Sequence, residues 1–227
     1  MMKNPLELFK NMLYPSRCAY CNEVLPMGKS VCAECERKLP RIYHPCRFCG
    51  REKADCRCNK AKHRYDGIVA PFYYKGIVKS ALLRLKKKTS NAGPIAAEIA
   101  AAVKYYYQNV DFDCIAYVPI KKSSLKAKGF DHSRILADEL SKSLNIPRRD
   151  LLEILIEPEA QHDLPKHLRH GNVRGIYDIK NKENLEGLTI LLIDDIKTTG
   201  ASLDECALML KLYNAEKVYA AVAAVTD

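Results

Sequence analysis

The sequence lacks the features of a membrane-spanning or secreted protein. No apolar run is long enough to cross a bilayer, and the first 18 residues have no continuous apolar core followed by a small-residue cleavage site. Leu6, Phe9 and Leu13 instead recur there at helical spacing. We therefore expect a short packing helix at this end and residence in the cytoplasm. Low-complexity segments are absent too, and paired cysteines are the only repeat.

Cysteine, by contrast, is abundant, and eight of the ten cysteines fall within residues 18–58. They form four close pairs, which are Cys18 with Cys21, Cys32 with Cys35, Cys46 with Cys49, and Cys56 with Cys58. Disulfides are unusual in the cytoplasm, whereas two thiolates two residues apart hold one edge of a tetrahedral zinc ion. The pattern predicts two structural zinc sites, grouped either in sequence or by cross-bracing, with redox chemistry at one pair as the alternative.

Two details of the cysteines refine this prediction. Cys56 and Cys58 are separated by one residue only, so the second site is less regular than the first. Cys114 and Cys206 stand alone in apolar segments, where cysteine behaves as a small core residue.

The segment Ile190–Ser202, ILLIDDIKTTGAS, combines a buried strand with a polar turn. Its four leading apolar residues do not alternate with polar ones, which is typical of a strand covered on both faces, and a helical pattern follows from Leu203. A helix N-terminus offers free N–H groups to an anion, and Asp194 and Asp195 can accept hydrogen bonds from ribose hydroxyls. A phosphate would be held by the loop residues Thr198, Thr199, Gly200, Ala201 and Ser202.

This motif resembles the ribose-phosphate signature of type I phosphoribosyltransferases, in which two acidic residues precede a Thr-Thr-Gly loop. The loop differs from a P-loop because it has no Gly-Lys-Ser/Thr ending. The alternative is a strand that ends in two aspartates without binding a nucleotide. The resemblance implies an α/β fold with a parallel sheet that binds phosphoribosyl pyrophosphate together with Mg²⁺.

A second loop is expected at the same edge of that sheet. The short strand Cys114–Val118 runs into Ile120 and Lys121, and ligands of open α/β sheets bind at the carboxyl ends of the strands. We therefore include Ile120 and Lys121 in the predicted binding site. Further strands are expected within 65–74, 175–179 and 219–225, and helices over 77–85, 94–107 and 133–144. No general base is evident.

Taken together, these landmarks resemble the ComF family of competence-associated proteins, which join a cysteine-rich zinc module to a phosphoribosyltransferase-like domain. The cysteine pairs, YVPI at 117–120, KGFDHSRILADEL at 128–140 and ILLIDDIKTTGAS carry the resemblance, with Gln161, Arg169 and Asn172 as a further match. Asp131 departs from the asparagine usual in the family, and its carboxylate would repel a phosphate. The implied division is a zinc module over 1–59 and a phosphoribosyltransferase-like domain over 60–227.

The sequence is compatible with two functions. One is transfer of ribosyl 5-phosphate from phosphoribosyl pyrophosphate to an unknown acceptor. The other, implied by the resemblance, is a non-catalytic accessory role in DNA uptake and natural transformation, with single-stranded DNA and uptake proteins as partners. Residues 1–110 carry 21 Lys and Arg against 8 Asp and Glu, while residues 111–227 carry 16 against 19. Such a basic half suits a polyanion, and we expect Lys86, Lys87 and Lys88 to contact DNA.

Overall fold

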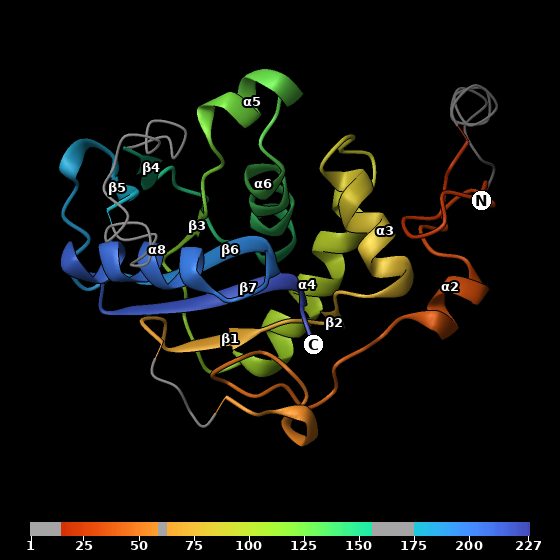
Figure 1. The fold of residues 1–227 in the computed structure, drawn as a ribbon, viewed down its shortest axis with the longest axis horizontal. Coiled ribbons are helices and arrows are strands. Elements are labelled where there is room, and N and C mark those ends of the chain that lie inside the picture. Colours follow the sequence, from red (N-terminus) through yellow and green to blue (C-terminus); the bar gives the residue numbers. More distant parts are fainter. Residues whose placement is uncertain (1–14, 59–62, 156–174) are drawn as a thin grey trace, which may run out of the picture.

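A computed structural model describes residues 15–58, 63–155 and 175–227 (Figure 1). Its centre is a five-stranded sheet in the order β1-β7-β6-β3, with β2 also paired to β7, and all of its pairings are parallel. The strands are β1 (Gly67–Val69), β2 (Phe72–Tyr73), β3 (Cys114–Tyr117), β6 (Thr189–Lys197) and β7 (Lys217–Val225). The predicted parallel α/β fold is confirmed.

The central strand β6 is covered on both faces, as its unbroken apolar run predicts. Residues Ile190 to Ile193 have no exposed surface. Leu191 and Ile193 pack into a core with α3 (Gly76–Leu85), α4 (Ala92–Tyr106) and α6 (His132–Leu144), whereas Ile190 and Leu192 pack with α8 (Ala201–Leu212). Figure 1 shows α8 on one side of the sheet, with α4 and α6 on the other. The two layers therefore enclose the strand that ends in the paired aspartates.

The helix α6 begins where the sequence predicts, because Asp131 caps it. The Asp131 carboxylate accepts hydrogen bonds from the backbone N–H groups of Ser133 at 2.9 Å and Arg134 at 3.1 Å. A shorter helix, α5 (Lys122–Lys128), precedes it and ends at Gly129 in the left-handed conformation. The sequence pattern predicts only a loop after β3, and the structure adds the helix α5 there.

A second sheet of two strands flanks the main one, and its strands are antiparallel. It pairs β4 (Leu152–Ile154) with β5 (Tyr177–Ile179) in antiparallel register, and the short helix η3 (Lys180–Lys182) follows β5. The strand expected within 175–179 is thus present, but it lies outside the parallel sheet. The residues Gln161, Arg169 and Asn172 and the expected helix at Leu6, Phe9 and Leu13 lie outside the described residues.

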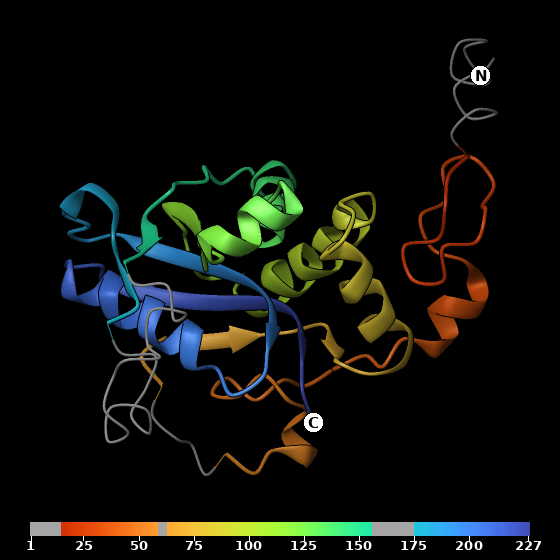
Figure 2. The same ribbon diagram turned by 45° about the horizontal axis from the view of Figure 1, so that its top comes forward.

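The two cysteine-rich segments dock at different places on the domain (Figures 1 and 2). The first, which contains α2 (Ala33–Lys38), packs beside α3, where the Arg84 guanidinium donates to the carbonyl oxygens of Ala19 at 2.8 Å and Tyr20 at 2.5 Å. The second, which contains η1 (Lys53–Asp55), lies against β1 and the end of β7. There Arg51 Nε donates to the Thr226 carbonyl at 2.9 Å, and Ile68 N donates to the Arg47 carbonyl at 3.0 Å.

No helix among the described residues is long and apolar enough to cross a membrane.

Candidate zinc centres and phosphate-binding site

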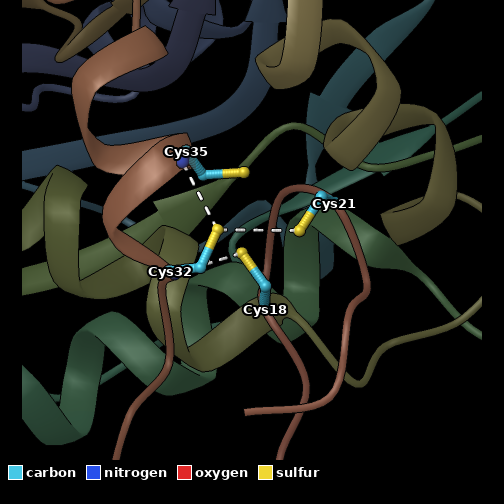
Figure 3. A group of neighbouring side chains, drawn as sticks. All are labelled: Cys18, Cys21, Cys32 and Cys35. Atoms are coloured by element: carbon cyan, nitrogen blue, oxygen red, sulfur yellow. Dashed lines mark hydrogen bonds between the residues drawn. The ribbon is translucent and has the colours of Figure 1, made fainter.

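The first cysteine group brings four sulfur atoms together from two segments of the chain. Figure 3 shows the side chains of Cys18, Cys21, Cys32 and Cys35 pointing toward one another, with Cys35 carried by α2. The ligand atoms all lie within 4.8 Å of one another. Cys21 Sγ and Cys32 Sγ are 3.8 Å apart, and four sulfurs around zinc at the usual Zn–S length are separated by about 3.8 Å. The spacing therefore fits a tetrahedral zinc ion.

The second group consists of Cys46, Cys49, Cys56 and Cys58, again within 4.8 Å of one another. Cys46 Sγ lies 3.9 Å from Cys58 Sγ, but Cys56 Sγ lies only 3.2 Å from Cys58 Sγ. The single-residue spacing of this last pair therefore makes the second site less regular. The grouping is sequential in both sites, so the cross-braced alternative is wrong.

The acidity of the thiols suits a divalent cation. Burial raises the pKa of Cys18, but hydrogen bonds from the backbone of Cys21 and Cys32 outweigh it and bring the pKa down to about 6. At Cys46 the same opposition of burial and backbone hydrogen bonds gives a pKa of about 7. Burial and the neighbouring thiols raise the pKa of Cys49 to about 12. Cys18 and Cys46 thus ionise readily, whereas the Cys49 thiol needs the positive charge of a metal to ionise.

The paired aspartates at the end of β6 have different surroundings. Asp194 is partly buried, and its Oδ1 accepts hydrogen bonds from Ser133 Oγ at 3.3 Å and from the Asp195 backbone N–H at 2.8 Å. Burial, with the Asp195 charge as a second cause, raises the pKa of Asp194 well above its ordinary value. Asp194 pairs with no cation among the described residues, so its oxygens remain available to a hydroxyl or a metal ion.

Asp195 is buried and already has a charged partner. Its Oδ2 lies 2.8 Å from Lys86 Nζ, at the end of α3, and 3.6 Å from His132 Nε2. Burial lowers the pKa of His132, so the ring stays neutral and Lys86 supplies the positive charge. Lys86 is therefore part of this site. Lys87 and Lys88, in contrast, are exposed.

The loop after β6 has the form expected of a phosphate cradle. Gly200 precedes α8 in the left-handed conformation, with φ of 87°, and Thr198 and Thr199 are exposed. Asp194 and residues 196–203 line a hollow of about 50 Å³ around this turn. The first-turn N–H groups of α8 have no partners within the helix, and they are suited to an anion. Ala201 and Ser202 thus begin the helix at the position that the motif predicts.

The second predicted loop lies at the same edge of the sheet. β3 pairs in parallel with β6, with Tyr117 beside Ile193, so Ile120 and Lys121 follow at the same end as Asp194. The Ile120 backbone N–H donates to Asp131 Oδ2 at 3.3 Å. The carboxylate that departs from the family pattern therefore holds this loop to the start of α6. Lys121 is partly exposed and immediately precedes α5.

Tyr73 and Tyr74, which lie in the basic half of the chain, have structural roles. Tyr73 is buried, and its hydroxyl donates to Asp55 Oδ2 at 2.6 Å and accepts from the Glu52 backbone N–H at 3.1 Å. Tyr74 is partly buried against the core beside α3. Tyr73 therefore connects the second cysteine segment to the sheet.

Comparison with known families agrees with this architecture. Residues 9–63 match the double zinc ribbon domain, and residues 130–226 match the phosphoribosyl transferase domain. We therefore call the two cysteine-rich segments, residues 15–39 and 40–58 of the described chain, the first and second ribbon.

Relatives match over most of the chain. Competence protein ComFC of Bacillus subtilis is 26% identical over 79% of this chain and 77% of its own. Competence protein F of Haemophilus influenzae is 23% identical over 89% of this chain and 93% of its own. Among solved structures, the glutamine phosphoribosylpyrophosphate amidotransferase of B. subtilis, complexed with ADP and GMP, matches with 20% identity and a TM-score of 0.40. That match covers 63% of this chain and 26% of the other. The chain is thus a homologue of the competence proteins ComFC and F, with an N-terminal double zinc ribbon followed by a phosphoribosyltransferase domain.

Proposed function

We propose that this protein binds phosphoribosyl pyrophosphate at the carboxyl end of β6 and acts in DNA uptake. The observation that carries the proposal is that Asp194 and the loop Thr198–Ser202 lie together at the end of one strand. Both fall within the residues that match a phosphoribosyl transferase domain. The names of the two competence proteins support the biological role. Among the described residues no cation pairs with Asp194, so its carboxylate can accept a hydrogen bond from a ribose hydroxyl.

Different residues would bind different parts of the ligand. The loop and the first N–H groups of α8 would hold the 5-phosphate, and Asp194 would accept hydrogen bonds from the ribose hydroxyls. Lys86 and Lys121 would neutralise part of the pyrophosphate charge. Mg²⁺ would add positive charge to the leaving pyrophosphate, and Asp194 offers the oxygen ligand that this cation prefers. Orientation and charge neutralisation are then the means of catalysis, if an acceptor is used.

Replacing both aspartates should weaken this binding. Each lost hydrogen bond to a ribose hydroxyl costs about 1–3 kcal/mol, so Asp194→Ala with Asp195→Ala should weaken phosphoribosyl pyrophosphate binding by at least about tenfold. Calorimetric titration in Mg²⁺ measures it. Asp111→Ala with Glu186→Ala removes two exposed carboxylates elsewhere and should leave affinity unchanged. Full affinity in a folded, zinc-loaded Asp194/Asp195 double variant would disprove the assignment.

The second candidate is a non-catalytic protein that binds single-stranded DNA. The observations in its favour are the competence relatives and the excess of Lys and Arg over Asp and Glu in residues 1–110. Exposed Lys87 and Lys88 at the end of α3 are the preferred contacts. Pyrophosphate release that depends on an added acceptor would favour the enzyme, whereas DNA binding without turnover would favour this candidate.

Charge reversal tests the contact directly. For single strands the logarithm of the binding constant falls against the logarithm of the salt concentration with a slope of about −0.7 per neutralised phosphate. Lys87→Glu with Lys88→Glu should therefore flatten the slope by about 1.4 if each lysine neutralises one phosphate. Lys180→Glu with Lys217→Glu, two exposed lysines of the acidic half, should not. Equal slopes for both double variants would place the DNA surface elsewhere.

A further inference from the structure

A cavity of about 470 Å³ lies between the second ribbon and the loop after β6. The ribbon side contributes Arg51 and Arg57, and His63 follows the ribbon in the chain. The domain side contributes Lys197, Thr198 and Thr199. This cavity is larger than the hollow of about 50 Å³ at the start of α8, which neither arginine lines. Two chain segments far apart in sequence therefore meet around a basic space.

Lys197 is the least expected member of this group. Its side chain is nearly enclosed, with the residue only 7% exposed, and it has no ion pair or hydrogen-bond partner among the described residues. It runs beneath the loop, because a Cβ built on Gly200 would lie 2.9 Å from Lys197 Cε. An enclosed cation without a partner is costly, and such a group is usually paired. Burial lowers the pKa of Lys197, and a negative charge in the cavity would favour its charged form.

The arginines add to this unbalanced charge. Arg57 is exposed and has no partner among the described residues, and Arg51 uses Nε for the Thr226 carbonyl. His63 differs, since its Nδ1 lies 2.9 Å from Asp204 Oδ2 and is already paired. Three cations, Lys197, Arg51 and Arg57, thus face the space.

The neighbouring thiolates do not remove the need for an anion. Cys49 and Cys58 border the cavity, and a zinc ion with four thiolates carries a net charge of about −2. Three positive side chains exceed that charge, those thiolates are committed to the metal, and the nearby Asp204 carboxylate is already paired with His63. Exposed Thr198 and Thr199 supply hydroxyl donors on the opposite wall. Cations combined with hydroxyl donors are the usual surroundings of a phosphate group.

We propose that this cavity binds a phosphate group, held by Lys197, Arg51 and Arg57 with the hydroxyls of Thr198 and Thr199. The site adjoins the ribose 5-phosphate cradle of the proposed function. Lys197, Thr198 and Thr199 line both, whereas Arg51 and Arg57 line this cavity and not the cradle. The phosphate belongs either to the backbone of a nucleic-acid strand or to a small sugar phosphate. In both cases the ligand contacts the second ribbon and the phosphoribosyltransferase domain together.

Equilibrium dialysis of the zinc-loaded full chain with radiolabelled inorganic phosphate tests the site. Lys197→Met keeps the approximate length of the buried side chain without its charge. Arg57→Gln removes a cation on the ribbon side of the cavity, and Arg57 does not line the loop cradle. Each should weaken phosphate binding by about tenfold, since each removes a charge-assisted hydrogen bond. Lys104→Gln, which removes one exposed charge on α4, is the matched control and should have no effect. Zinc content is measured for every variant, because Arg57 lies between two ligands.

The outcomes separate this proposal from its rivals. Unchanged phosphate binding in both variants would overturn it, because the cations would then only balance the thiolates. Loss in Lys197→Met alone would also overturn it, because the phosphate would belong to the loop cradle. Competition by oligothymidylate identifies a nucleic-acid backbone as the source, whereas competition by ribose 5-phosphate alone identifies a sugar phosphate. Phosphoribosyl pyrophosphate binding should persist in Arg57→Gln. Failure of the proposed function would appear separately, as a wild-type chain that does not bind phosphoribosyl pyrophosphate.

Discussion

Purified protein should contain two zinc ions per chain, and their removal should unfold both ribbons. Structural zinc supplies about 10–16 kcal/mol in zinc-finger peptides at neutral pH, which is more than a small ribbon gains from its core. The first ribbon also contributes buried Ala19 and Tyr20 to the core shared with α3. Chelation should therefore lower the melting temperature of the remaining chain. Metal analysis, circular dichroism and limited proteolysis measure these effects.

Single cysteine substitutions assign each ion to its site. Cys35→Ser and Cys49→Ser should each reduce the zinc content by one ion, because the groups do not share ligands. Cys114→Ala is the control, since Cys114 is a buried residue of β3 outside both groups, and it should retain both ions. One ion in the wild-type chain would show that the irregular Cys56–Cys58 pair does not complete a site. Loss of both ions in either variant would contradict two independent centres.

Gly200→Ala should impair both stability and phosphoribosyl pyrophosphate binding. A residue with a side chain costs about 1–2 kcal/mol in the left-handed conformation that Gly200 adopts. The added Cβ would also approach Lys197 Cε to 2.9 Å, so the loop or the lysine must shift. Because the loop N–H groups must converge on one phosphate, even a small shift should weaken binding more than it weakens folding. Denaturant unfolding and calorimetric titration measure the two effects.

The chain offers a control for the backbone part of this effect. Gly129 is also left-handed, with φ of 77°, and a Cβ there meets nothing within 4 Å. Gly129→Ala should cost similar stability but leave ligand binding intact. Combining Lys197→Ala with Gly200→Ala should recover the part of the stability loss that contact between the new Cβ and the lysine causes. Equal ligand affinity in Gly129→Ala and Gly200→Ala would contradict the role given to the loop.

Local patterns were sufficient to predict the strand and loop that carry the candidate site. The run Ile190–Ile193 specifies a strand buried on both faces, and the small residues at 200–202 specify the beginning of α8. Cysteine spacing likewise predicts two zinc sites, because both ligands of a close pair lie on one turn of chain. In these cases neighbouring residues alone determine the structure. The domain boundary near residue 59 remains a prediction, as it lies outside the described residues.

Long-range contacts account for what the sequence did not predict. Lys86 belongs to a basic run that is typical of a solvated helix end, yet α3 lies where its Nζ reaches Asp195. Lys197 has the side chain of an exposed residue, but it is buried beside Gly200, at a cavity that the second ribbon also lines. β5 has an ordinary strand pattern, which does not specify its antiparallel partner β4. Each of these features depends on residues far away in the sequence, and a local pattern contains no information about them.

The position of β7 has a consequence for the order in which the molecule folds. This last strand lies inside the sheet, between β1 and β6, and Thr226 beyond it holds Arg51 across a separation of 175 residues. During synthesis the ribbons emerge first, but the surface that receives the second ribbon is completed last. Contacts so distant in sequence slow folding, and an unfinished chain exposes the edges of β1 and β6 to other chains. We therefore expect truncation of the C-terminal strand to cause aggregation of the whole chain, rather than to leave a folded shorter protein.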